Sequence, residues 1–199
     1  MHILWFRRDL RLNDNESVAR AAANNAQVLP CFIIDPWFYE QPEVGKARVR
    51  FLFESMENLD NSLRNCGSQL YLFEGNSVDI LQQLTQQLIQ IGHKPKLYFN
   101  RDVQVEYGIS RDRAIANFYH QLNLEYHIGL NNFLQTDDDR RNQWFDEYYT
   151  YVRQSPRYCF GSLLLLAIAY LEYEKIDNKI KLYTEVRVDK VLIHGLPSF

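Results

Sequence analysis

The chain has 199 residues, 46% hydrophobic and 24% charged, which is the composition of a globular domain with a packed core. Its formal net charge of −3 excludes the overall basic footprint that free-standing DNA-binding domains usually carry. The longest apolar run, Leu163–Leu171, is about half as long as a membrane span requires, and no secretion signal precedes the first apolar run. We therefore expect a cytoplasmic protein that does not enter a membrane.

The cysteines and histidines predict no metal site and no disulfide framework. Cys31, Cys66 and Cys159 are widely spaced, odd in number and form no CxxC pair. The histidines are scattered, and no HExxH pair occurs. Cys31 lies in an apolar run, so we expect it in the core.

Five short apolar runs alternate with helical patterns along the first two thirds of the chain. They predict strands at Ile3–Phe6, Val28–Ile34, Gln69–Phe73, Lys96–Asn100 and Glu125–Ile128. Pro30 cannot donate to a central ladder but is tolerated near the start of a strand. We predict an α/β fold with a doubly wound, five-stranded parallel sheet, Rossmann-like, in the order 3-2-1-4-5.

The intervening segments show helical spacing. Asn15 is expected to cap a helix through Asn24, and Ser77 to cap another that ends at Gly92. The helix between them is expected to face inward with Val49, Leu52, Phe53, Met56, Leu59 and Leu63, and outward with Arg50 among others. A further helix after Ser110 is expected to face inward with Ile115, Phe118 and Leu122.

The pattern changes after about Leu134. Trp144–Arg153 is expected to be helical, Ser162–Glu174 to form a short helix and Val186–Ile193 a strand. We divide the chain into an α/β domain, residues 1–135, and an irregular, partly helical tail, residues 136–199, that combines a connector remnant with a divergent end.

Three turns that follow strands carry polar and aromatic side chains. They are Arg7–Arg11, Asp35–Trp37 and Asn100–Asp102, and a sheet of this order brings them around one hollow near strands one and four. Arginines there can clamp a phosphate or carboxylate or stack on a flat ring. Asp9 and Asp14 can equally pair with those arginines and simply fix the loop. The aromatic residues can line a ligand or merely cover the sheet edge.

The usual catalytic and phosphate-binding motifs are absent from the sequence. No GxGxxG follows the first strand, and neither a P-loop nor a nucleophile elbow occurs. Hydrolase and dehydrogenase functions therefore have no residue support, and we predict no catalytic residue.

Several segments, in order over about residues 1–135, closely resemble the photolyase/cryptochrome family. They are Ile3–Asn15, reading ILWFRRDLRLNDN, then Ile34-Asp35-Pro36, Arg48–Ser55, Leu59-Asp60 with Leu63-Arg64, Asn100–Val103 and Arg111-Asp112. Trp144–Tyr158 resembles the start of the connector between the two domains of that family, more loosely.

The resemblance implies a light-dependent role. Full-length members repair pyrimidine dimers in DNA as carbon–carbon lyases, or act as blue-light photoreceptors. Their FAD lies in a C-terminal helical domain over which DNA docks with the dimer flipped in, whereas the N-terminal domain holds an antenna chromophore. We expect this chain to stop before the FAD domain, to lack repair activity alone, and to meet FAD and DNA only through a separate helical domain.

The resemblance also indicates the antenna. Folate-binding members have a glutamate just before the pair that matches Arg111-Asp112, whereas Gly108-Ile109-Ser110 stand here. Asp102 matches an acidic position that contacts the ring in deazaflavin-type members. A deazaflavin or flavin is therefore favoured over folate, and the candidate binding residues are Arg8, Asp35, Pro36, Trp37, Arg50, Asn100 and Asp102. A generic nucleotide- or flavin-binding module and a non-functional fragment remain the alternatives.

Overall fold

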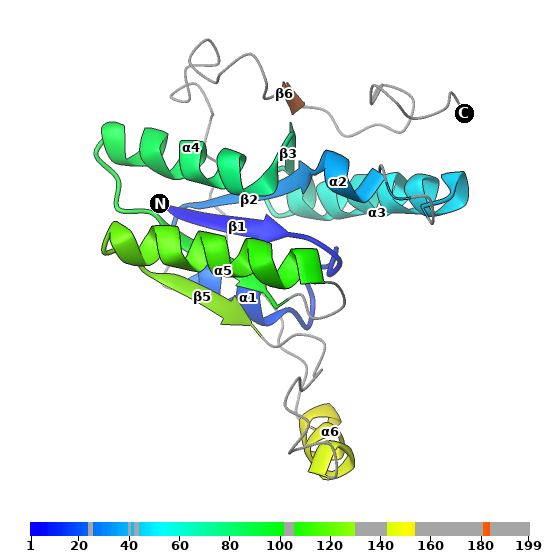
Figure 1. Ribbon diagram of the computed structural model, residues 1–199. Helices are drawn as coiled ribbons and strands as arrows, with labels where there is room; N and C mark the ends of the chain where they lie inside the picture. The colour runs from blue at the N-terminus through cyan, green and yellow to red at the C-terminus, as the bar shows by residue number, and fades with distance from the viewer. Residues whose placement is uncertain are drawn as a thin grey trace.

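The computed structural model describes residues 1–23, 26–39, 41, 44–101, 106–129, 143–153 and 181–183. At its centre five parallel strands run side by side in the order β3-β2-β1-β4-β5 (Figure 1). They are β1 (His2–Phe6), β2 (Val28–Ile34), β3 (Tyr71–Glu74), β4 (Lys96–Asn100) and β5 (Tyr126–Gly129). The predicted α/β class, parallel sheet and strand order are confirmed.

Pro30 is accommodated because of where the neighbouring strand begins. It lies opposite Leu4 of β1, but the pairing of β2 with β3 starts only at Cys31. The missing N–H therefore falls where β2 has a partner on one side only. Cys31 itself is fully buried, as expected.

A sixth strand, β6 (Lys181–Tyr183), extends the sheet beyond β3 and pairs with it antiparallel. This strand is not among those expected from the sequence. Three residues that include a lysine show too little alternation to be recognised as a strand.

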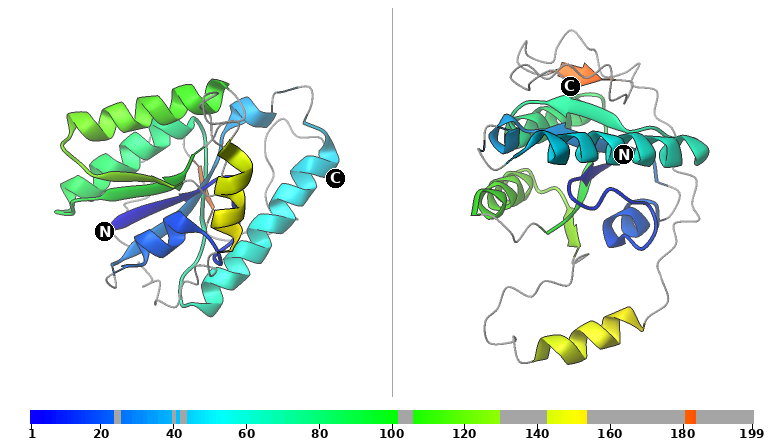
Figure 2. Two further views of the ribbon diagram at one scale, coloured as in Figure 1. Left: turned by 90° about the horizontal axis from the view of Figure 1, so that it is seen from below. Right: turned by 90° about the vertical axis from the view of Figure 1, so that its right-hand side faces the viewer.

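Helices cover both faces of the sheet (Figure 2). On one face, α1 (Glu16–Ala21) and α3 (Lys46–Asn65) bury side chains such as Val18, Phe53 and Met56 against Leu4 and Phe6. On the other, α4 (Ser77–Gln90) and α5 (Glu106–Gln121) bury Leu81, Leu84, Ile115 and Tyr119 against Ile3, Trp5 and Phe99. Alternate residues of β1 thus supply both cores, which is typical of a doubly wound sheet.

The expected helix starts are partly right. The side chain of Asn15 accepts from the Val18 N–H at 3.2 Å and caps α1, which is confirmed. The cap of α4 is Asn76, which accepts from the N–H groups of Val78 and Asp79, so the prediction of Ser77 is wrong. Ser77 lies one residue after the cap position, and its hydroxyl donates to Asp35 instead of capping the helix.

The predicted inner face of α5 needs one correction. Ile115 is buried and Phe118 is partly buried, but Leu122 is 40% exposed and lies beyond the end of the helix. Tyr119 takes the buried position, because it lies four residues after Ile115 on the same helical face. Its hydroxyl and that of Thr85, both fully buried, bond at 2.7 Å.

The tail is described only in part. Its helix α6 (Trp144–Val152) confirms the helix expected after Trp144. Outside the tail, a short helix, α2 (Pro36–Tyr39), follows β2. The expected helix Ser162–Glu174 and strand Val186–Ile193 lie outside the described residues. The boundary between residues 135 and 136 stays a prediction. Within the described ranges no helix is long and apolar enough to cross a membrane.

Gly129, at the end of β5, is a position where a side chain does not fit. A Cβ there would collide with the Asn100 Oδ1 and lie 3.0 Å from the Ser17 Oγ. We expect Gly129→Ala to destabilise the domain by about 1–3 kcal/mol, because overpacking displaces a buried hydrogen-bonded amide. Urea unfolding measures this. Gly45→Ala, at a site with nothing within 4 Å, is the control and should change stability by less than Gly129→Ala does.

Candidate functional site

The turn after β1 is tied directly to the end of β4. The Arg7 guanidinium donates to the Asn100 carbonyl and, at 2.6 Å, to the Asp112 carboxylate on α5. The Asn100 amide donates to the Asp9 carboxylate and, at 3.0 Å, to Asn15. Two of the three turns expected around one hollow are therefore joined by buried hydrogen bonds.

The space beyond the carboxyl ends of the neighbouring strands β1 and β4 is filled by these side chains. Asn100 is 4% exposed, and its Oδ1 accepts from the Ser17 hydroxyl at 2.7 Å while its Nδ2 donates twice. Its amide is thus committed within the protein. Asp9, which bonds to Asn15 and Asn100, is equally enclosed. The expectation that a ligand lies between strands one and four is therefore not met by this geometry.

Asp35, after β2, joins three elements. Its Oδ2 accepts from the Ser77 hydroxyl at 2.6 Å, the Ser77 N–H at 3.1 Å and the Tyr107 hydroxyl at 2.7 Å. Its Oδ1 accepts from the Trp37 N–H at 3.1 Å. Burial raises the pKa of Tyr107, and the hydrogen bond that its hydroxyl donates to Asp35 raises it further. Asp35 is 2% exposed and positions the start of α2 against α4 and α5.

Trp37 and Phe38 form an aromatic wall with Tyr107. The rings of Trp37 and Tyr107 stack 4.1 Å apart at 8°, and Phe38 meets both of them edge-on. Such offset and edge-to-face pairs fix ring orientation as well as burying area. Phe38 also lines a pocket.

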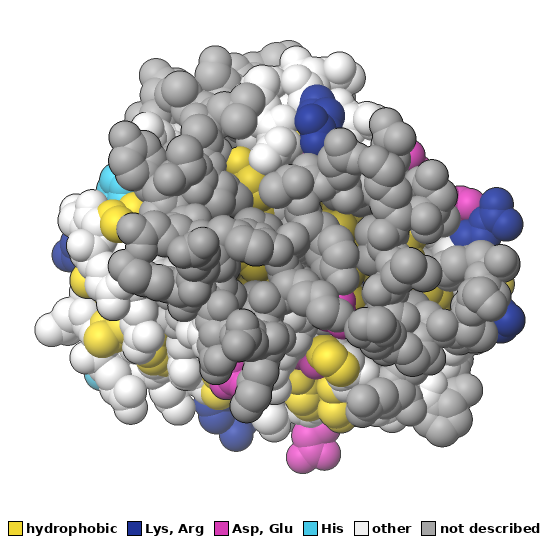
Figure 3. All heavy atoms as spheres, turned by 90° about the horizontal axis from the view of Figure 1, so that it is seen from above, with side chains coloured by type: hydrophobic (Ala, Val, Ile, Leu, Met, Phe, Trp, Pro, Cys, Tyr) yellow, Lys and Arg dark blue, Asp and Glu magenta, His cyan; other side chains and the backbone are white. Residues whose placement is uncertain are grey.

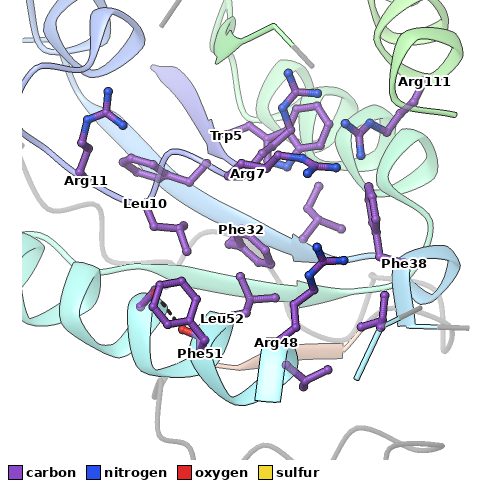
Figure 4. A pocket seen from close by; sticks show the side chains of 16 residues that line it. Trp5, Arg7, Leu10, Arg11, Phe32, Phe38, Arg48, Phe51, Leu52 and Arg111 are labelled. Atoms are coloured by element: carbon purple, nitrogen blue, oxygen red, sulfur yellow. Dashed lines mark hydrogen bonds between the residues drawn. The ribbon is translucent and has the colours of Figure 1, made fainter. Parts of the chain in front are cut away.

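This pocket has a volume of about 490 Å³ and lies at the carboxyl ends of β1 and β2, between the turn after β1, α2 and α3 (Figure 4). Its size is in the range of about 300–1,000 Å³ that small-molecule sites occupy. It is lined by Trp5, Phe6, Arg7, Arg8, Leu10, Arg11, Phe32, Ile33, Phe38, Val44, Arg48, Val49, Phe51, Leu52, Ser55 and Arg111.

The lining is apolar and positively charged. Among the described lining residues there are five arginines and no aspartate or glutamate. Figure 4 shows Arg48 reaching from α3 toward Arg7 and Phe38, with Arg11 and Arg111 at opposite ends of the pocket. In a chain of net charge −3, this concentration of positive charge favours an anionic ligand with a flat apolar body.

Two of the arginines are held at the inner side of the pocket around Trp5. The guanidinium carbons of Arg7 and Arg111 lie 4.7 Å and 4.8 Å from the centre of the Trp5 ring. Arg7 bonds to Asp112 at 2.6 Å, and the Arg111 Nε lies 3.6 Å from the same carboxylate oxygen. All four side chains are buried, so this cluster is fixed before any ligand arrives.

The residues expected from the sequence fall into three groups. Arg8 lines the pocket. Asp35, Trp37 and Asn100 lie behind its walls in the networks described above, and Pro36 is exposed at the first position of α2. Arg50 lies outside the lining and forms an exposed ion pair with Glu54 at 2.8 Å, while Asp102 lies outside the described residues. Their binding roles stay predictions.

Several residues that line the pocket are not among the candidates named from the sequence, although the sequence contains a signal for them. Arg48, Phe51, Leu52 and Ser55 are spaced i, i+3, i+4 and i+7 along α3, so they share one helical face beside the core stripe. Arg111 lies four residues before Ile115 and therefore faces inward on α5. An arginine on an apolar stripe is the pattern that points to such a pocket.

Other kinds of site find no support in the described part of the chain. No group of three or more His, Cys, Asp or Glu side chains that could hold a metal ion occurs among the described residues. On the face shown in Figure 3, the visible Lys and Arg side chains lie apart near the margin and form no continuous basic patch.

Comparisons with known proteins agree with this architecture. The chain is 36% identical over 130 residues to Cryptochrome-1 of Aedes aegypti, which covers 62% of this chain and 23% of that protein. It is 35% identical over 114 residues to the deoxyribodipyrimidine photo-lyase of Synechococcus sp., covering 57% and 22%. The chain thus spans less than a quarter of the length of these relatives.

A solved structure shares the fold and part of the sequence. The archaeal photolyase from Sulfolobus tokodaii, described with two FAD molecules and a novel light-harvesting cofactor, superimposes with a TM-score of 0.68 at 26% identity. The match covers 83% of this chain and 38% of that one. The family model described as DNA photolyase matches residues 2–154, which include all five parallel strands and α6. On this match, supported by the strand order and by the relatives above, the chain belongs to the DNA photolyase family.

Proposed function

We propose that this domain binds an antenna chromophore in the arginine-lined pocket, a flavin or deazaflavin rather than a folate. In this role the domain absorbs light and passes the excitation to FAD held by a helical domain. DNA and FAD then meet this chain only through that domain. The light-driven repair of pyrimidine dimers, or blue-light sensing, belongs to the assembled protein, and this chain supplies no catalytic residue of its own.

The observation that carries the proposal is the composition of the pocket. Among the described residues that line the cavity there are five arginines and no carboxylate, and apart from Ser55 the others are aromatic or aliphatic. A tricyclic ring in the pocket meets Phe38 and other apolar side chains, and it lies close to guanidinium groups. The guanidinium carbon of Arg111, for example, lies 5.6 Å from the centre of the Phe38 ring. Arg8 and Arg48 are exposed at the rim, where a phosphate can stay partly hydrated.

The volume of the pocket, about 490 Å³, suits a mononucleotide-sized ligand, and the archaeal relative supplies a precedent. That protein is described with two FAD molecules and with the implication of a novel light-harvesting cofactor. A flavin in this pocket is the matching assignment for the present chain. Asp35, Trp37 and Asn100 then act by positioning the pocket walls, Pro36 by starting α2, and Asp102 and Arg50 as further contacts to be tested.

The proposal predicts a preference for phosphorylated flavin. We expect the purified chain to bind flavin mononucleotide at least about tenfold more tightly than riboflavin, because one charge-assisted hydrogen bond contributes about 1.5–3 kcal/mol. Fluorescence titration measures both affinities. Raising the salt concentration should narrow the difference, since exposed charges are screened.

Parallel titrations with a deazaflavin and a folate identify the chromophore class. A folate that binds more tightly than either tricyclic ring would contradict the assignment. If the chain is supplied with saturating chromophore and retains none of it through gel filtration, the antenna function itself is contradicted. Energy transfer from the bound chromophore to FAD in a co-expressed helical domain separates an antenna from a generic flavin-binding module.

A further inference from the structure

Trp5 poses a chemical problem for a light-absorbing ligand. Among the described residues that line the pocket it is the only tryptophan or tyrosine. Indole is readily oxidised, and an excited flavin-type ring in contact with it accepts an electron. The products are an indole radical cation and a ligand radical anion. The electron then returns to the indole, and the excitation energy is lost as heat.

The structure surrounds this indole with positive charge. The guanidinium groups of Arg7 and Arg111 lie over the Trp5 ring at 4.7 Å and 4.8 Å. Both are buried, and both lie next to the carboxylate of Asp112. In a site with little water, this charge acts on the ring with less screening than in solution.

We propose that Arg7 and Arg111 make Trp5 a poor electron donor and thereby preserve the excited state of the ring that the pocket holds. Removal of an electron from Trp5 creates a third positive charge beside two fixed ones, which raises the energy of the charge-separated state. The neutral indole, in contrast, is stabilised by its contacts with both cations. This inference rests on the proposed function and concerns the fate of the excitation rather than the binding of the ligand.

The arrangement of the second aromatic group supports the same conclusion. Trp37 and Tyr107 stack on each other, and Tyr107 donates a hydrogen bond to Asp35, an arrangement that eases oxidation because the proton can move to the carboxylate. These rings lie behind Phe38, which separates them from the cavity. Trp5, the donor that lines the pocket, thus has two guanidinium groups within 4.8 Å of its ring centre, whereas the Tyr107 ring has that of Arg111 at 5.7 Å.

Time-resolved fluorescence of flavin mononucleotide bound to the full chain tests the proposal. Arg111→Gln removes one cation, and we expect the lifetime of the bound flavin to fall several-fold. Arg111→Lys, which keeps the charge, should restore most of the lifetime. Trp5→Phe alone should leave the lifetime nearly unchanged, and Trp5→Phe combined with Arg111→Gln should abolish the loss. Free flavin decays with its own lifetime, so the bound component is resolved separately, and weaker binding changes its amplitude but not its lifetime.

A several-fold longer lifetime in Trp5→Phe would overturn the proposal, because Trp5 would then quench despite its arginines. An unchanged lifetime in Arg111→Gln would overturn it as well. If the unaltered chain binds no flavin, the proposed function fails, and flash oxidation of the ligand-free chain by a ruthenium complex provides the second test. There, Arg111→Gln should raise the yield of tryptophan radical through Trp5, and an equal yield would refute the shielding role.

Discussion

Replacement of Arg7 by methionine should lower the free energy of unfolding by about 3–5 kcal/mol, the range expected when one partner of a buried ion pair is removed. Methionine keeps much of the apolar contact with Trp5 and Phe99 but donates no hydrogen bond. Two buried acceptors, the Asp112 carboxylate and the Asn100 carbonyl, then lose this donor. Urea unfolding of the ligand-free chain, followed by circular dichroism, measures the loss.

The double variant Arg7→Met, Asp112→Asn is the informative comparison. Removal of the negative charge eliminates most of the penalty for leaving it buried, so we expect the double variant to be more stable than Arg7→Met alone. Arg50→Met provides a matched exposed control. Its ion pair with Glu54 is solvent-exposed, and its loss should cost less than about 1 kcal/mol. An Arg7→Met variant as stable as Arg50→Met would show that the cluster does not hold the site together.

The fold was predictable because each local signal agreed with the parallel architecture. Five short apolar runs separated by helical stripes leave few topologies open, and Asn15 and Gly92 mark the start of one helix and the end of another at the sequence level. The exceptions depend on tertiary contacts. Ser77 does not cap α4 because Asp35 competes for its hydroxyl, and β6 is recognisable only once the edge of β3 is known.

The site was predictable as a region but only partly residue by residue. The turns after β1 and β4 do meet, yet Asn100 and Asp9 satisfy each other and fill the gap where the ligand was expected. The alternative that the acidic residues fix the loop describes Asp9 well. Hydrogen bonds between residues some 90 positions apart decide which side chains remain available to bind a ligand. A sequence pattern does not reveal those bonds.

Helix α3 carries two arginines that differ in position, because one lines the pocket and the other does not. Arg50 was selected through the family resemblance, although the apolar stripe places it on the outer face of the same helix. Arg48, two residues earlier, lines the pocket. Both are exposed and each carries one positive charge, so the pair forms a built-in control for any electrostatic effect on ligand binding.

Arg48→Ala should weaken the binding of flavin mononucleotide by about ten- to hundredfold, which is the loss expected for one charge-assisted contact to a phosphate. Arg50→Ala should weaken it less than about threefold at 0.15 M salt, because a charge outside the pocket acts only through screened solvent. Riboflavin, which has no phosphate, should bind both variants about as well as it binds the unaltered chain. Equal losses of flavin mononucleotide affinity in the two variants would show that this pocket is not where the phosphate binds. A loss confined to Arg50→Ala would instead support Arg50, the residue that the family resemblance selected, as the contact to the phosphate.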